Sequence, residues 1–151
     1  MKRRSLRGFQ IALLALTLVV IWGHSCIPVA GSAAESGRLT GLLQELLGPE
    51  SSDYITDHLI RKLAHFTEYA ALGFQLLLLL PRPPGFKKGV LALNLAFIAA
   101  FLDESIQMLS DRGDMISDVW LDCGGACFGI LLACLILKLR QKSCLENKKT
   151  I

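Results

Sequence analysis

The segment Gly89–Leu109, GVLALNLAFIAAFLDESIQML, decides the fold of this 151-residue chain. As a helix it is about 30 Å long, which matches the hydrocarbon core of a bilayer. Its end carries Asp103, Glu104 and Gln107. A charge in the middle of a membrane helix costs roughly 2.5–3.5 kcal/mol, so such groups usually face a protein interior or a wet cavity. The segment therefore predicts a membrane helix whose polar end belongs to a functional site.

Three further apolar blocks lie at Phe9–Ile27, Leu63–Leu80 and Val119–Leu139. As helices, all three blocks have about the same length as Gly89–Leu109. Only helices and closed barrels satisfy their backbone hydrogen bonds in lipid, and these blocks lack the alternation of barrel strands. The sequence thus predicts an all-α integral membrane protein, an antiparallel bundle of four transmembrane helices.

Charged residues are distributed unequally over the segments that flank the blocks. If the four helices alternate in direction, twelve of the 16 basic residues fall on one side, and only Glu146 of the 13 acidic residues joins them. Basic flanks stay in the cytoplasm, so we expect a multi-pass protein of the cell membrane with both termini cytoplasmic. A basic inner rim suits anionic lipids. Because topology explains these basic groups, we expect membrane lipids as partners and no nucleic acid.

The chain divides into four predicted segments. Residues 1–27 form an N-terminal transmembrane helix, with a cleaved signal peptide as the alternative because small residues follow it. Residues 28–60 form an external segment. Residues 55–139 form a domain with three transmembrane helices, and residues 140–151 form a basic cytoplasmic tail.

The external segment contains a regular pattern of leucines. Their spacing predicts an amphipathic helix that ends at Gly48-Pro49 and lies flat on the outer membrane face. The leucines are Leu39, Leu42, Leu43, Leu46 and Leu47.

Polar residues lie in or beside three of the blocks. Lys62, His65 and Tyr69 share one helical face, whereas Glu68 points away from it, toward the block Phe9–Ile27. The block Gly89–Leu109 runs outward, so its acidic residues reach a similar depth in the membrane. We therefore expect one polar layer at the outer leaflet. The candidate binding residues are Lys62, His65, Glu68, Tyr69, Asp103, Glu104, Gln107, Arg112, Asp118 and Asp122.

This layer holds more acidic than basic groups. Like charges in a poorly solvated layer cannot all ionise, so we expect either a protonated carboxyl or a bound cation. No cofactor is predicted, because the chain lacks a paired-histidine metal motif. The carboxylates nevertheless provide the oxygen ligands that a divalent cation accepts. A polar network that only holds three helices in register is the alternative to a functional site.

The last block in the chain, Val119–Leu139, combines with Asp118 to place polar and small residues on one face. Asp118, Asp122, Gly125 and Gly129 lie close together on its helical wheel. A Gly-x-x-x-Gly pair allows membrane helices to approach closely. We therefore expect this face to point inward and to pack against another helix.

Three motifs, on three predicted membrane helices, resemble those of the VanZ family and make residues 55–139 a VanZ-like domain. They are Lys62-x-x-His65-Phe66-x-Glu68-Tyr69-x-x-Leu72-Gly73, Asp103-Glu104-x-x-Gln107, and Arg112 followed by Asp118-x-x-x-Asp122-x-x-Gly125-x-x-x-Gly129. The chain departs from the pattern at Ser110-Asp111, where the family often has Pro-Gly, and at Asp122, where it often has Asn. The resemblance implies a small bacterial membrane protein of a family named for low-level teicoplanin resistance, with no settled biochemical activity.

Three functions fit these observations. In the first, the polar layer binds a cell-wall precursor, a lipid head group or a glycopeptide, and contributes to teicoplanin-type antibiotic resistance. In the second, a membrane enzyme uses His65 with Asp103 or Glu104 for acid–base chemistry on a lipid-linked or acylated substrate. There, Lys62 and Arg112 stabilise developing negative charge. The third, a small transporter, is least favoured because the polar groups stay in one leaflet.

Overall fold

A computed structural model describes residues 2–27, 29–48, 54–81, 85–109 and 116–149. Within these ranges the chain forms five helices and no strand, which confirms the all-helical prediction. The helices are α1 (Lys2–Ser25), α2 (Val29–Leu47), α3 (Asp57–Leu79), α4 (Phe86–Leu109) and α5 (Ile116–Lys149).

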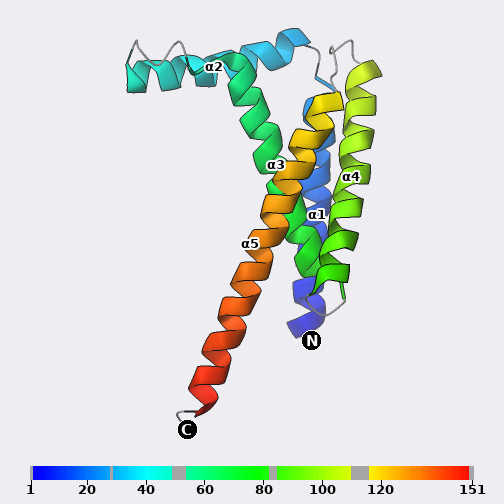
Figure 1. The fold of residues 1–151 in the computed structure, drawn as a ribbon. Coiled ribbons are helices and arrows are strands. Elements are labelled where there is room, and N and C mark those ends of the chain that lie inside the picture. The colour runs from blue at the N-terminus through cyan, green and yellow to red at the C-terminus, as the bar shows by residue number, and fades with distance from the viewer. Residues whose placement is uncertain (1, 28, 49–53, 82–84, 110–115, 150–151) are drawn as a thin grey trace.

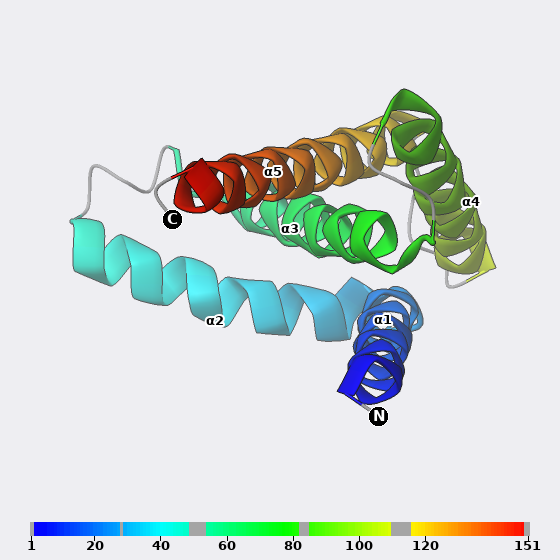
Figure 2. The ribbon, with the colours of Figure 1, turned by 90° about the horizontal axis from the view of Figure 1, so that it is seen from below.

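Helix α3 is the centre of the arrangement. It packs against α1, α2, α4 and α5, and most extensively against α5. Figure 1 shows that α1, α3, α4 and α5 run lengthwise, whereas α2 lies across one end. The start of α1 and the end of α5 both point away from α2, toward the opposite end, where α5 extends further (Figure 1). Seen from below, α3 lies among α1, α4 and α5 (Figure 2).

Three helical stretches among the described residues are long and apolar enough to cross a membrane. They are Ser5–Ser25, Phe86–Leu109 and Ser117–Ser143. The remaining predicted block, Leu63–Leu80, lies almost entirely in α3. This helix is less apolar than the three stretches above. The reason is the composition of its first half, which carries Lys62, His65 and Glu68.

Glycine residues allow α3 and α5 to approach each other closely. A Cβ atom added at Gly125 or Gly129 would collide with backbone carbonyl oxygens of α3. From the other side, a Cβ atom at Gly73 would collide with the backbone of Ala126. The close helix contact predicted for the block Val119–Leu139 is thus confirmed. The partner helix is α3, which contributes Gly73 to the contact.

Helix α4 presents a stripe of small side chains to the interior. The same stripe continues into buried Asp103 and Gln107 at the end of the helix. Small residues let membrane helices pack tightly. Because Asp103 and Gln107 lie on the same face of α4 as these small residues, they are buried as well. The buried alanines of the stripe are Ala92, Ala96, Ala99 and Ala100.

The predicted amphipathic helix is present as part of α2. It ends at Gly48, whose φ of 92° is the left-handed conformation that favours glycine at a helix C-terminus. Ser36 and Thr40 are buried, whereas the leucines at 39, 42, 46 and 47 are exposed. An exposed leucine face on a helix that lies across the bundle end suits a membrane surface.

Helix α5 continues beyond the predicted transmembrane block. It remains helical to Lys149, so most of the segment predicted as a basic tail is an extension of the helix. In Figure 1 this extension projects past the ends of the other helices.

Candidate functional site

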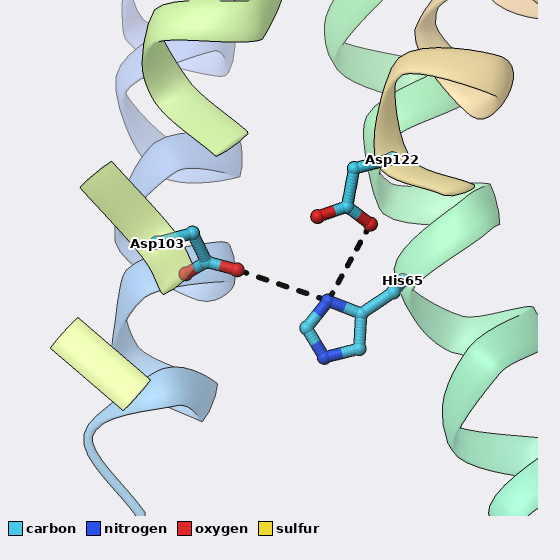
Figure 3. Close-up of side chains that lie close together, drawn as sticks. All are labelled: His65, Asp103 and Asp122. Atoms are coloured by element: carbon cyan, nitrogen blue, oxygen red, sulfur yellow. Dashed lines mark ion pairs between the residues drawn. The ribbon is translucent and has the colours of Figure 1, made fainter. Parts of the chain in front are cut away.

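Side chains from α3, α4 and α5 meet in one buried place. The Nδ1 atom of His65 lies 3.8 Å from Oδ2 of Asp103 and 3.8 Å from Oδ1 of Asp122. One nitrogen or oxygen atom from each residue lies within 4.8 Å of the other two. Figure 3 shows the imidazole ring pointing between the two carboxylates. We call these three residues the His–Asp–Asp cluster.

The close contact of α3 and α5 positions two members of this cluster. Gly125 lies against the backbone of Phe66, the residue that follows His65. Because the two helices nearly touch there, Asp122, which is three residues before Gly125 and on the same face, reaches the imidazole of His65. The glycine face of α5 therefore also determines the site.

A chain of hydrogen bonds from α1 holds Asp103. The Nε2 atom of Gln107 donates to Oδ2 of Asp103 at 3.3 Å and to Oγ of Ser25 at 3.3 Å. The Ser25 hydroxyl in turn donates to the carbonyl oxygen of Ile21 at 3.3 Å. Four residues separate Asp103 from Gln107, so both lie on the same face of α4.

Several polar atoms of the site are buried and have no hydrogen-bond partner. They include both carboxylate oxygens of Asp122, Oδ1 of Asp103 and the hydroxyl of Tyr69. All three side chains have essentially no exposed surface. Buried polar groups are normally paired, and each unpaired one costs about 1–3 kcal/mol.

A separate ion pair lies toward the start of α3. The Nζ atom of Lys62 is 3.4 Å from Oδ1 of Asp118, and both side chains are about one-third exposed. The hydroxyl of Ser117 donates to the same oxygen of Asp118 at 3.4 Å. Lys62 therefore lies near solvent at the edge of the site, beside a partner that it can exchange for a ligand.

The remaining candidate residues have different positions. Glu104 is buried, at 7% exposure, but lies outside the cluster. Glu68 points toward α1, as predicted, and its Oε1 atom is 2.9 Å from Nδ1 of His24. Arg112 lies outside the described residues. The nine candidates that the structure describes thus separate into a buried centre, an edge pair and a contact with α1.

Sequence reasoning placed Glu68 toward α1 but missed the residues of α1 that take part. Ser25 supports Asp103 through Gln107, His24 pairs with Glu68, and the indole of Trp22 donates to the carbonyl oxygen of Ala99 at 3.4 Å. The available signal was the polar pair of residues 24 and 25 at the end of an apolar block.

Within the described residues, the fold and the site define an all-helical protein with three stretches long and apolar enough to cross a membrane, in which α3, α4 and α5 contribute polar groups to one buried centre. The model of the VanZ/LLP1 family matches residues 9–137, which is most of the chain, and the chain belongs to this family. The match begins in α1 and ends in α5, so it extends beyond the three motifs. No curated protein and no solved structure is similar enough to count as a match.

Proposed function

We propose that this VanZ-like protein crosses the bacterial cell membrane four times, with both termini in the cytoplasm. The start of α1 and the end of α5 lie at one end of the molecule, where the basic segments gather. Basic flanks favour the cytoplasmic side. Helix α3 crosses as the fourth span, because it packs against all four other helices and turns His65 toward the buried acids of α4 and α5. The His–Asp–Asp cluster then lies nearer the outer surface.

In this orientation the site binds the head group of an envelope lipid or of a lipid-linked cell-wall precursor. The observation that carries this proposal is the pair of partly exposed side chains, Lys62 and His65, on one face of α3 beside the buried carboxylates. Asp103 and Asp122 are enclosed, and His65 is one-fifth exposed. A whole glycopeptide is too bulky to reach them. A head group held at the edge by Lys62 can contact His65, since both lie on the same face of α3.

Binding of this kind would contribute to teicoplanin-type resistance. A protein that holds wall precursors or changes their distribution at the outer leaflet reduces the precursor that a glycopeptide can capture. The resistance effect follows from occupancy of the site by lipid. Variants that lose lipid binding should therefore lose protection in proportion.

The test measures lipid retention and susceptibility in the same variants. Protein extracted from the native membrane should carry an envelope lipid that native mass spectrometry detects, and Lys62→Ala and His65→Ala should lose it. Thr67→Ala is the matched control, because Thr67 is exposed on α3 and its hydroxyl bonds only to carbonyl oxygens of its own helix. Teicoplanin susceptibility should rise in the first two variants alone. Equal lipid retention in all of them would refute the proposal.

A second candidate function is catalysis on the same lipid. The observation that favours it is the position of His65 between two buried carboxylates, an arrangement that can orient and charge an imidazole acting as acid or base. If the protein is an enzyme, membranes that contain it should accumulate a lipid product that His65→Ala abolishes. Unchanged lipid composition together with retained lipid would leave binding as the function.

A further inference from the structure

The His–Asp–Asp cluster has the composition and spacing of a metal site. In a tetrahedral zinc site with bonds of about 2.0–2.2 Å, neighbouring ligand atoms lie roughly 3.3–3.6 Å apart. The two distances from Nδ1 of His65 are each 3.8 Å, and the three atoms lie within 4.8 Å of one another. Small side-chain rotations would bring all three into coordination range.

Tyr69 provides a second, independent observation. Its side chain has no exposed surface and its hydroxyl has no hydrogen-bond partner, although it follows His65 by one helical turn. Asp103 and Asp122 are among its electrostatic neighbours. A buried hydroxyl beside two carboxylates with free oxygens indicates that the protein folds around a group that would complete these contacts.

A bound cation would also balance the charge of the site. Two fully buried carboxylates with one imidazole would leave negative charge in a poorly solvated interior, and Lys62 is engaged at the edge by Asp118. A divalent cation neutralises both carboxylates at once. Gln107 and Ser25 already hold Asp103 in place, as groups behind a metal ligand commonly do.

We infer that His65, Asp103 and Asp122 bind one divalent transition-metal cation, with zinc as the best fit. An imidazole nitrogen with carboxylate oxygens suits zinc better than magnesium or calcium, which take all-oxygen sites. Three protein ligands leave a position for water or for an oxygen atom of a head group. This inference does not depend on lipid binding, because the three ligands come from the chain itself.

Metal titration of the full chain tests the inference. The protein should carry an affinity tag without histidines and be stripped with a chelator. Zinc should then bind with a stoichiometry of one and raise Tm, and cobalt in its place should give a visible absorption spectrum. His65→Ala and Asp122→Asn should each weaken binding at least tenfold. His58→Ala and Asp57→Asn are matched controls on α3 outside the cluster and should bind normally.

X-ray absorption on the zinc-loaded wild type gives a readout that does not depend on variants that fold. One imidazole and otherwise oxygen ligands are expected. Absence of stoichiometric binding, a sulfur shell, or equal binding by His65→Ala and Asp122→Asn would overturn the inference. Lipid retention should be measured in parallel on the stripped protein. Retained lipid without metal binding would refute the metal site alone, whereas metal binding without lipid would refute only the lipid proposal.

Discussion

Asp122 has two carboxylate oxygens, and neither is exposed or accepts a hydrogen bond. Local helix geometry does not require an acid there, since a residue of similar size would fill the same space. Keeping a carboxylate in such a position costs stability, as functional groups often do. At the scale of single residues, the stability that Asp122 costs the protein indicates a functional rather than a structural role for this carboxylate.

Asp122→Asn should therefore stabilise the metal-free protein. The amide can donate a hydrogen bond to the cluster, where the carboxylate oxygens have no partner, so the free energy of unfolding should rise by about 1–3 kcal/mol. Unfolding in mixed micelles measures the change. Asp118→Asn serves as the control, because it removes a partly exposed pair with Lys62 and should change stability little. Clear destabilisation by Asp122→Asn would show that the carboxylate is a structural group.

Gln107 should act on metal affinity without contacting the metal. Gln107→Met keeps the volume of the side chain but removes the hydrogen bonds to Asp103 and Ser25. Loss of such a supporting group typically weakens metal binding by about 10–100-fold. Zinc titration measures this, with Ser105→Ala as a control on the same helix, since the Ser105 hydroxyl bonds only to the carbonyl oxygen of Phe101. Unchanged affinity in Gln107→Met would contradict the supporting role.

At the scale of helices, the glycine contact between α3 and α5 makes a sharp prediction. A Cβ atom at Gly129 would collide with the carbonyl oxygen of Ala70, and the α3 backbone cannot move without disturbing the whole helix. Gly129→Ala should lower the free energy of unfolding by about 1–3 kcal/mol, the usual cost of overpacking. It should also separate His65 from Asp122 and weaken the site.

Gly124 offers the matched control for this substitution. It lies on the same helix, and a Cβ atom there would be 3.9 Å from Cε2 of Phe66, an ordinary contact. Gly124→Ala should therefore leave stability unchanged or raise it slightly, because alanine has the higher helix propensity. Equal effects of the two alanine substitutions would mean that the helices do not approach as closely as the structure indicates.

The helices and their inward faces could be predicted from the sequence, because apolar length and helical spacing are local properties. Which faces meet depends on packing, and local spacing does not encode it. Asp103 and Glu104, for example, point about 100° apart on a helix, so spacing could not determine which of them approaches His65. The contact of Gln107 with Ser25 depends on the rotation of α1, and it became visible only in the folded chain.

At the scale of the whole molecule, the opposite placement of α2 and the chain ends predicts a fixed topology (Figure 1). After replacement of the native cysteines, Tyr54→Cys should react with a membrane-impermeant thiol reagent added to intact cells. Tyr54 is 79% exposed and lies between α2 and α3. Ser5→Cys and Ser143→Cys, both at exposed positions, should react only after permeabilisation. Labelling of residues 54 and 143 from the same side would contradict four crossings.

The alternating direction of four helices predicted that both chain ends lie toward the same end of the molecule, which the structure shows (Figure 1). That this end is cytoplasmic stays a prediction from the basic flanks. The helical extension of α5 was not predicted, since its charged residues are typical of a solvated tail as much as of a helix. Apolarity alone also missed the central position of α3. The helix packs against all four other helices, and its buried residues run from Tyr69 to Leu77, an arrangement that exists only in the folded chain.

Solid-state NMR of the isotope-labelled chain in bilayers tests directly whether three helices bring one histidine and two aspartates together. The imidazole nitrogens of His65 should show through-space correlations with the side-chain carboxyl carbons of both Asp103 and Asp122, as expected for separations near 3.8 Å. Asp57, at the start of α3, should show none. Correlations of His65 with neither Asp103 nor Asp122 would contradict the buried cluster, and with it the metal site and the proposed function.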